Sequence, residues 1–262
     1  MSKPTSLFGL SDIGKVRLRN EDSFCVLPAL GVAVVADGMG GHPGGDVASQ
    51  IAAEVTATVL SETLEKDAHG EDASTRMRAA MSRSVAEAHE GIRARGQEDA
   101  ELIGMGTTLT ALVVDVPSLT YVIGHVGDSR AYLFREGKLE QLTRDDTWVQ
   151  DRVEAEQLTP EQARRHPFGH LLTQCLGLEA PPTPHILEGS IRAGDTYLLC
   201  TDGLVGMLED DELERILSEQ FSSNGARSED PAPVQALLDA ANEAGGHDNI
   251  TVAIVHIHDE DA

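Results

Sequence analysis

Aliphatic runs and segments of helical spacing follow one another in the first third of the chain. The runs at 23–27 and 31–36 are rich in β-branched or aliphatic side chains and are bounded by turn residues, so they predict two short strands. Apolar residues then recur at helical spacing over 48–59, and again on one face over 77–92. Both patterns predict long amphipathic helices, each of which covers one side of a sheet.

The rest of the chain is dominated by short strands joined by tight turns. The runs that predict strands lie at 107–114, 119–126, 131–134, 139–142, 196–200 and 250–257. Successive short strands with tight turns between them pair in an antiparallel sheet. A helix predicted over 234–244 ends at Gly245 and separates the last two strands. Because strands and helices fall into separate groups, we predict an α+β fold in which helices pack outside antiparallel sheets.

A polar segment with helical character interrupts the strand pattern between residues 147 and 165. Thr159 is placed as a helix N-cap, and Pro160 stands at the first helical position. We therefore predict that this charged segment is a surface flap. No repeat, low-complexity stretch or linker divides the sequence, so we expect residues 1–262 to form a single domain.

The charge balance of the chain limits its partners. The 262 residues include 20 basic and 44 acidic side chains, which give a formal charge of −24, and 40% of them are hydrophobic but only 3% aromatic. This aliphatic content predicts a folded chain with an aliphatic core. The acidity counts against nucleic acid and anionic lipid as partners, because electrostatic attraction supplies most non-specific affinity for both.

The lack of a membrane span or secretory signal in the sequence, together with the spacing of its cysteines, predicts a cytoplasmic protein. No apolar run approaches the roughly 18 residues of a membrane span, and the N-terminal residues lack the features of a secretory signal. Cys25, Cys175 and Cys200 form no Cys-x-x-Cys pair. This spacing argues against a disulfide framework or a zinc–thiolate site and favours a reducing compartment.

Acidic residues stand where aliphatic strands end or begin. They are Asp37, Asp128 and Asp202 after a strand, and the pair Glu21-Asp22 and Asp248 before one. A single Asp beside Gly, Asn or Ser is a common turn, but their combination at rigid strand ends predicts that carboxylates converge at one edge of the sheets. Like charges held there would raise one another's pKa values and destabilise the fold. Bound divalent cations remove that conflict.

The chemistry of these candidate ligands favours a particular kind of ion. All of them are oxygens, with no Cys or His at the matching places, which favours Mg²⁺ or Mn²⁺ over Zn²⁺. One carboxylate between two ions about 4 Å apart makes a two-metal hydrolytic centre that yields hydroxide at neutral pH. Arg17, four residues before Glu21, offers a planar fork to phosphate oxygens, although a surface salt bridge would also account for it.

Six motifs occur in order: SDIGKVRLRNEDSF, VVADGMGGHPGGDVAS, GMGTTLTALVV, VGDSRAYLFREGKLEQLT, LLCTDGL and GGHDNITVAIV. With them the sequence resembles the PPM (type 2C) family of metal-dependent serine/threonine phosphatases, in its compact bacterial form, over residues 7–257. The resemblance implies a four-layer α-β-β-α sandwich, in which two packed antiparallel β-sheets are flanked by α-helices. Residues 147–176 would be the flap of the bacterial members.

The resemblance also implies metal ligands at matching positions. Asp37 would bridge two Mn²⁺ or Mg²⁺ ions, with the carbonyl of Gly38 on the second ion. Asp202 and Asp248 would complete the protein ligands of the first ion. Asp128 would hold a third, weaker ion together with Asp202.

Other matching residues would bind water, phosphate or protons. Glu21 and Asp22 would act largely through metal-bound waters, and Arg17 would bind the substrate phosphate. Met39 stands where animal members carry the His proposed as general acid. His42 is the nearest alternative as proton donor, and a metal-bound water is another.

Two further positions follow from the same motifs. Asn249 would support the geometry around Asp248. Asp146 replaces the His commonly found after the Asp of the motif that begins at Leu142, and nothing in the sequence accounts for that change.

The implied reaction is hydrolysis of phosphoserine and phosphothreonine in proteins by hydroxide held between two metal ions, without a covalent phosphoenzyme. A bacterial serine/threonine kinase and its targets would be the partners, in cytoplasmic signal transduction. One alternative is a catalytically silent regulator of the same fold that binds phosphoproteins. A two-metal nuclease or nucleotide phosphohydrolase is another, although the −24 charge without a basic stripe counts against nucleic acid.

Overall fold

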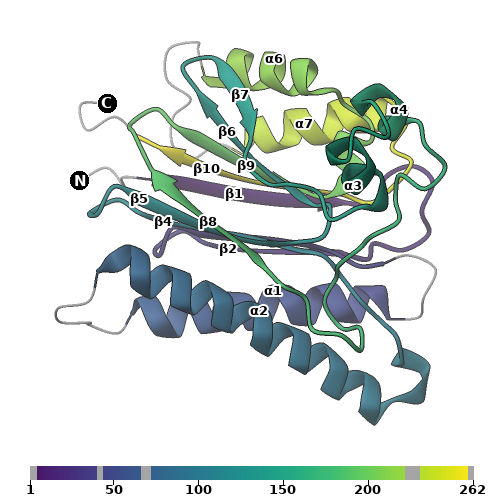
Figure 1. Ribbon diagram of the computed structural model, residues 1–262. Coiled ribbons are helices and arrows are strands. Elements are labelled where there is room, and N and C mark those ends of the chain that lie inside the picture. The colour runs from purple at the N-terminus through teal and green to yellow at the C-terminus, as the bar shows by residue number, and fades with distance from the viewer. Residues whose placement is uncertain (1–4, 40–43, 66–71, 222–230, 259–262) are drawn as a thin grey trace.

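The computed structural model describes residues 5–39, 44–65, 72–221 and 231–258. In these residues two five-stranded antiparallel sheets lie face to face, and helices cover the outer face of each sheet (Figure 1). The predicted four-layer α-β-β-α sandwich is therefore confirmed.

The first sheet has the strand order β2-β3-β4-β5-β8. Its strands are β2 (Asp22–Leu27), β3 (Val32–Asp37), β4 (Leu109–Asp115), β5 (Thr120–Val126) and β8 (His185–Ser190). Two long helices, α1 (Gly45–Leu64) and α2 (Ala73–Glu98), cover its outer face and form the lower layer in Figure 1. They are the two amphipathic helices predicted from the sequence.

The second sheet has the strand order β1-β10-β9-β6-β7. Its strands are β1 (Thr5–Asp12), β6 (Arg130–Arg135), β7 (Lys138–Gln141), β9 (Thr196–Cys200) and β10 (Ile250–Ile257). The helices on its outer face are α6 (Asp210–Phe221) and α7 (Ala232–Glu243). A single turn of helix, α5 (Asp202–Val205), follows β9 directly.

Alternating side chains on β3 show why its sequence is aliphatic throughout. Val32 and Val34 point into the core beneath α1 and α2, whereas Ala33 and Val35 point into the core between the two sheets. A strand that is buried on both faces needs apolar residues at every position. Full burial of one valine side chain contributes about 1.5–3 kcal/mol, so this strand is a stable support for the residue at its end.

The flap, residues 147–176, carries two short helices beside the strand ends, α3 (Trp148–Glu154) and α4 (Pro160–Arg164) (Figure 1). The N-cap of α4 is Thr159, as predicted. Its hydroxyl accepts a hydrogen bond from the backbone N–H of Gln162, and the Gln162 side chain accepts one from the N–H of Thr159.

Apart from single helical turns, three elements were missing from the sequence-based prediction: β1, β8 and α6. The first two are edge strands of their sheets, and most of their side chains are only half-buried. Edge strands need few aliphatic residues, so the apolar signal is weak. The signal for α6 was present, because Leu213, Ile216 and Leu217 lie at helical spacing and are buried. Across the described residues, no helix is long and apolar enough to cross a membrane.

Antiparallel pairing brings the acidic strand ends to one edge. Asp22 at the start of β2 lies directly opposite Asp37 at the end of β3. Cys200 at the end of β9 lies opposite Val252 in β10, so Asp202 leaves one strand where Asp248 approaches the other. Val126 at the end of β5 lies opposite Leu109 at the start of β4, which places Asp128 at the same edge.

Candidate active site

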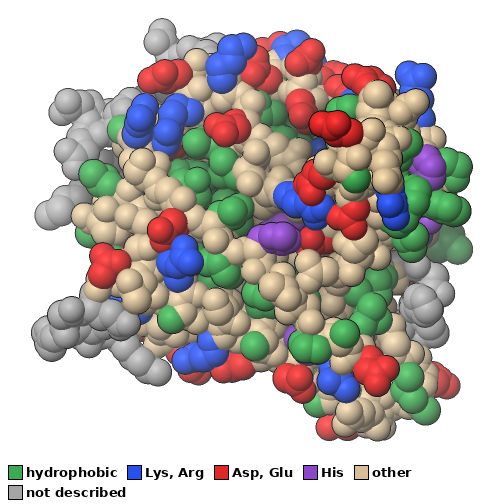
Figure 2. Space-filling model, in the orientation of Figure 1, with side chains coloured by type: hydrophobic (Ala, Val, Ile, Leu, Met, Phe, Trp, Pro, Cys, Tyr) green, Lys and Arg blue, Asp and Glu red, His purple; other side chains and the backbone are tan. Residues whose placement is uncertain are grey.

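A cleft of about 370 Å³ opens at this edge. Charged side chains line one part of it: Arg17, Glu21, Asp37, Asp128, Asp202 and Asp248. Apolar side chains line the other part, which comes mostly from the flap: Met39, Leu171, Leu172, Cys175 and Leu178. Figure 2 shows apolar side chains gathered at the right-hand edge of the molecule beside α3 and α4, and Phe168 and Leu171 of the flap are among the exposed large ones. The cleft therefore has an acidic floor and an apolar wall.

Asp37 is held through its backbone by two threonines at the start of β4. Its N–H donates to the hydroxyl of Thr108 at 2.9 Å, and its carbonyl accepts from the hydroxyl of Thr107 at 2.8 Å. Burial raises the pKa of the Asp37 carboxyl well above its usual range, and repulsion from neighbouring carboxylates, first among them Asp22, raises it further. The backbone of Asp37 is thus fixed firmly, while its charge is unfavourable.

Asp22 lies across the strand pair from Asp37 and is 9% exposed. Burial raises the pKa of Asp22 to about 7, against hydrogen bonds from Thr251 and Thr201 that lower it. The Thr201 hydroxyl donates to its Oδ2 at 2.8 Å. These two threonines hold the side chain in place without neutralising it.

The other two buried carboxylates show the same conflict. Burial followed by repulsion from Asp202 raises the pKa of Asp128 well above its usual range. Burial followed by repulsion from Asp248 raises the pKa of Asp202. Among the residues that the structure describes, no Lys or Arg forms an ion pair with Asp37, Asp128 or Asp202. The described part of the chain therefore does not neutralise these three carboxylates.

Gly38 follows Asp37 at a point where the backbone of three segments comes together. Its N–H donates to the carbonyl of Glu21 at 3.1 Å. A Cβ at this position would lie 2.2 Å from the carbonyl oxygen of Gly45 and 2.5 Å from that of Glu21. Only glycine fits here, so the backbone beside Asp37 can reach the cleft without a side chain in the way.

Glu21 and Asp46 lie close together where the segment before β2 meets the start of α1. Burial raises the pKa of Glu21, and repulsion from Asp46 is the next cause. The hydroxyl of Ser49 in α1 donates to the Glu21 carbonyl at 2.6 Å, which attaches this segment to the helix.

Arg17 pairs with Asp248 inside the cleft. Its Nη2 lies 2.6 Å from Asp248 Oδ2, and the two side chains are 44% and 35% exposed. Asn249 supports this arrangement: its N–H donates to Asp248 Oδ1 at 2.8 Å, and its amide oxygen accepts from the Glu21 N–H at 2.9 Å. The side-chain amide of Asn249 also donates to the carbonyls of Ile13 and Arg19. The loop that carries Arg17 is therefore anchored to the start of β10.

The donor set fits a hard divalent cation. The candidate side-chain ligands on the acidic floor are all carboxylates, which offer oxygen, and positive charge relieves their crowding. In the described ranges, no three His, Cys, Asp or Glu side chains already form a complete cage around one point. Mg²⁺ and Mn²⁺ do not require such a cage, because ions of this class retain several waters and also bind backbone carbonyls.

Residues 15–240 match the family model described as protein phosphatase 2C. The chain belongs to this family. The recognised motifs, the sandwich fold and the acidic cleft thus agree, and the resemblance identified from the sequence is confirmed.

Named members of the family are similar to this chain over nearly its whole length. The chain is 39% identical to the serine/threonine protein phosphatase PstP of Mycobacterium tuberculosis (strain H37Rv), over 96% of its own length but 45% of that protein. It is 34% identical to the serine/threonine phosphatase stp of Listeria welshimeri, over 94% of its own length and 93% of that protein. The chain thus spans less than half the length of PstP.

A solved structure of the same family contains metal. The catalytic domain of PstP in complex with two manganese ions superposes with a TM-score of 0.79 at 33% identity, and the match covers 97% of this chain and 99% of that one. The manganese belongs to that protein. It shows that a family member with this fold holds two such ions.

The structure gathers most of the predicted site residues of this family member into one cleft. Arg17, Glu21, Asp37, Gly38, Asp128, Asp202 and Asp248 line it. Asp22 is buried against Asp37, as the strand pairing requires. The predicted proton donor His42 lies outside the described residues, and Met39 lines the cleft. His170 of the flap also lines the cleft and was not anticipated.

Sequence reasoning also missed the threonines that hold the carboxylates. Thr107, Thr108 and Thr201 are at most 2% exposed and bond to Asp37 or Asp22. A hydroxyl residue in or beside a buried aliphatic strand needs a partner, so these positions did carry a signal.

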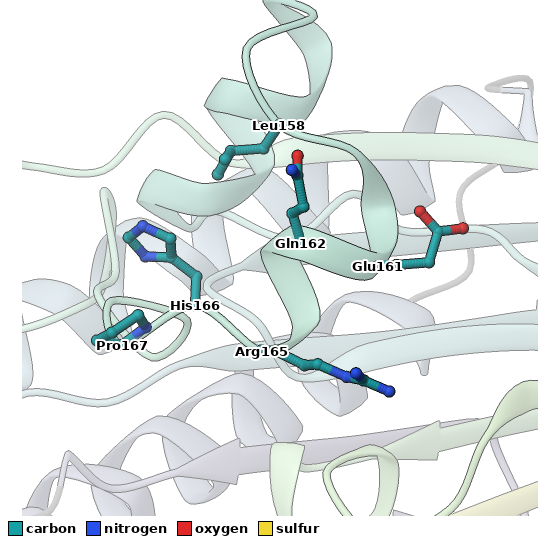
Figure 3. Close-up of a pocket in the computed structure, with 6 residues that line it drawn as sticks. All are labelled: Leu158, Glu161, Gln162, Arg165, His166 and Pro167. Carbon is teal, nitrogen blue, oxygen red and sulfur yellow. The ribbon is translucent and has the colours of Figure 1, made fainter.

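A second hollow lies on the flap itself, away from the acidic floor. Figure 3 shows its lining residues, which come from α4 and its flanking turns: Leu158, Glu161, Gln162, Arg165, His166 and Pro167. None of the cleft carboxylates lines it. Close by, the rings of Trp148 and His166 pack in a tilted arrangement with 5.2 Å between their centroids, which joins α3 to the segment after α4.

Proposed function

We propose that this chain hydrolyses phosphoserine and phosphothreonine in proteins, in a metal-dependent reaction that reverses a bacterial serine/threonine kinase. The observation that carries the proposal is the convergence of Asp37, Asp128 and Asp202, which no cation of the described chain neutralises. Membership of a family whose named relatives are serine/threonine phosphatases supports it.

The residues of the acidic floor would divide the work of holding ions. Asp37 would be shared between two ions, the Gly38 carbonyl would serve one of them, and Asp202 and Asp248 would serve the other. Glu21 and Asp22 would bind through water. Two Mn²⁺ or Mg²⁺ ions held in this way would supply positive charge and an activated water for attack on phosphorus. Asp128 would share a weaker third site with Asp202.

Arg17 would bind the phosphate group of the substrate. In the structure its guanidinium faces Asp248 across the cleft with both side chains about half exposed, so little energy holds the pair together. Once Asp248 serves an ion, the guanidinium fork is free to bond two phosphate oxygens. Arg17 would then stabilise the charge that develops on phosphate.

The apolar wall would exclude water from one side of the reacting group. Leu171 and Leu172 of the flap, and Leu178 just after it, line the same cleft as the carboxylates. Such a wall strengthens electrostatic interactions in the cleft. The proton that the leaving serine or threonine oxygen needs would come from His42, which stays a prediction, or from water.

The reducing conditions of the cytoplasm suit this chain. All three cysteines are free thiols, and Cys175 lies at the cleft. Burial raises the pKa of Cys175 to about 11, so it is a poor nucleophile. A cysteinyl phosphoenzyme is therefore not part of the proposal.

The test is turnover of a phosphothreonine peptide against Mn²⁺ concentration, for the parent chain and two variants. Asp37→Ala removes the shared ligand, and we expect at least about a thousandfold loss of rate. Asp115→Ala is the matched control, because Asp115 also ends a strand but at the opposite end of β4, and we expect the parental rate. Parental activity in Asp37→Ala would overturn the proposal.

A substrate panel separates the alternatives. We expect the phosphopeptide to be hydrolysed faster than a nucleotide or an oligonucleotide. Faster hydrolysis of either of those would show a different phosphohydrolase. Phosphopeptide binding without single-turnover hydrolysis at saturating Mn²⁺ would show the silent regulator.

A further inference from the structure

Asp146 lies between β7 and α3, behind the cleft, and its carboxylate is buried and fully engaged. The side chain is 1% exposed. Its Oδ2 accepts a hydrogen bond from the backbone N–H of Gly127 at 3.0 Å. Its Oδ1 accepts from His185 Nε2 at 2.8 Å and from the Gln174 side-chain amide at 3.3 Å, and Arg144 Nη1 lies 3.5 Å away.

The backbone of Asp146 bonds to the same two segments. Its N–H donates to the carbonyl of Gly127 at 2.7 Å, and its carbonyl accepts from the N–H of Thr173 at 2.8 Å. Gly127 is therefore held on both sides. The bond to the Gly127 carbonyl fixes the peptide unit between Gly127 and Asp128, the candidate ligand of the third ion.

Gly127 occupies a turn that only glycine fits. Its φ is +106°, which disfavours a residue with a side chain, and a Cβ there would lie 2.6 Å from Thr108 Cγ2. With the turn pressed against Thr108 on one side and bonded to Asp146 on the other, the direction in which Asp128 enters the cleft is set by these two neighbours.

The flap reaches Asp146 from the other direction. The Trp148 N–H donates to the Leu171 carbonyl at 2.8 Å, and Thr147 pairs with Leu172 in a short β-bridge. Bonds from Thr173 and Gln174 to Asp146 continue this attachment. Because Leu171 and Leu172 line the cleft, the segment that forms its apolar wall is attached to the same residue as the Asp128 turn, through backbone bonds and through one bond from Gln174 to the carboxylate.

We propose that Asp146 is a positioning residue: it holds the Gly127–Asp128 turn and the flap segment 171–174 in one arrangement, so that the acidic floor and the apolar wall of the cleft are set together. The proposal rests on the proposed function of the cleft. Asp146 acts through Gly127 and the flap and touches neither substrate nor ion. It also gives a physical reason for Asp at this position, since a carboxylate accepts from all these donors at once.

A carboxylate of equal burial elsewhere serves as the matched control. Asp195 is also 1% exposed, pairs with Arg135 at 2.6 Å and accepts from the backbone N–H of Arg192 at 2.7 Å. It precedes β9, whereas Asp202 follows that strand, so Asp195 lies at the end of the sandwich away from the cleft. Asp195→Asn therefore shows how the loss of a buried carboxylate far from the cleft affects amide exchange and turnover.

The first experiment is amide hydrogen exchange of the metal-free protein. For Asp146→Ala we expect about tenfold faster exchange at Gly127, whose N–H loses its acceptor, with β10 unchanged. At Thr173 we expect a smaller increase, because its backbone acceptor remains but the neighbouring Gln174 loses its bond to the carboxylate. For Gln174→Ala we expect faster exchange in the flap segment alone. In Asp195→Asn, exchange of both segments relative to β10 should be the same as in the parent chain. Should Asp146→Ala fail to fold, Asp146→Asn replaces it: one amide oxygen can still accept from Gly127, but an NH₂ faces Gln174, so the flap segment exchanges faster.

The second experiment is steady-state turnover of a phosphothreonine peptide and of a small aryl phosphate. For the Asp146 variants we expect the Michaelis constant of the peptide and the Mn²⁺ concentration for half-maximal rate to rise about fivefold or more. The Michaelis constant of the aryl phosphate should rise less, because that molecule is too small to need the wall. Asp195→Asn should change neither these Michaelis constants nor the Mn²⁺ concentration for half-maximal rate.

Two results would overturn the proposal. One is parental exchange at both Gly127 and Thr173 in a folded Asp146 variant. The other is faster exchange of the same two segments, relative to β10, in Asp195→Asn. A parent chain that turns over no phosphopeptide would instead refute the proposed function, and the exchange data, recorded without metal or substrate, would still decide whether Asp146 joins the two segments.

Discussion

The molecule buries carboxylates in two different ways. Away from the cleft floor, Asp195 and Asp145 are 1% and 15% exposed and pair with Arg135 at 2.6 Å and Arg130 at 2.7 Å. On the cleft floor, Asp37, Asp128 and Asp202 have no arginine or lysine partner among the described residues, and burial with repulsion from other carboxylates raises their pKa values.

The comparison separates the carboxylates that serve the fold from those that the fold merely tolerates. Removing one partner of a buried carboxylate–arginine pair is strongly destabilising, because the other charge is left buried without compensation. Several unpaired carboxylates close together cost stability, and such clusters are typical of functional sites. The sign of the stability change on mutation should therefore differ between the two groups.

The largest effect should come from breaking a paired carboxylate. Asp195→Asn leaves the Arg135 guanidinium without its partner, and we expect the free energy of unfolding to fall by about 3 kcal/mol, since Arg135 keeps some exposure. Urea denaturation of the metal-free protein measures this. A loss below about 0.5 kcal/mol would show that the pair does not support the fold.

Each bound metal ion should stabilise the protein by nearly as much. Mn²⁺ at a hundred times its dissociation constant should raise the free energy of unfolding by about 2.7 kcal/mol for each ion bound only to the folded state. Asp37→Asn should abolish most of this gain, whereas Asp195→Asn should keep it. Equal unfolding midpoints with Mn²⁺ and with a chelator would contradict the metal assignment.

Removing a crowded carboxylate should stabilise the metal-free protein. Asp37→Asn relieves both the burial of a charge and its repulsion of Asp22 and Asp202, and we expect a gain of about 1 kcal/mol. Asp115→Asn, at the other end of the sandwich, should change stability by less than about 0.5 kcal/mol. A clear loss of stability in metal-free Asp37→Asn would place Asp37 in the paired group.

The smallest effect on stability should come from Arg17. Its pair with Asp248 is about half exposed, so Arg17→Ala should change the free energy of unfolding by no more than about 0.5 kcal/mol. If Arg17 binds phosphate, the Michaelis constant for a phosphopeptide should nevertheless rise about tenfold. A parental Michaelis constant would favour the surface salt bridge as its whole role.

The sequence was informative where burial is complete. Val32 to Ala36 are buried on both faces of their sheet, and an uninterrupted aliphatic run of this length is typical of such a strand. The same run predicted the position of Asp37, because a rigid strand fixes the residue that follows it. Edge strands such as β8 were missed, since one hydrogen-bonded neighbour and a half-exposed face tolerate polar residues.

Contacts between distant segments could not be predicted from the sequence. Asp146 carries no local signal of its bond to Gly127, and Arg17 none of its pairing with Asp248, which is 231 positions away. Such contacts depend on how the two sheets and the flap come together. The threonines that bond to Asp37 were partly predictable. Polar residues next to an apolar strand stand out in the sequence, but the sequence does not show which group they bond to.

The most direct test of the central claim is calorimetric titration of the metal-free protein with Mn²⁺. If the unpaired carboxylates of the cleft form a metal centre, the parent and Asp115→Ala should each bind two ions, and Asp37→Ala should lose that binding. A parent chain that takes up no Mn²⁺, or an Asp37→Ala variant that binds as the parent does, would contradict the account.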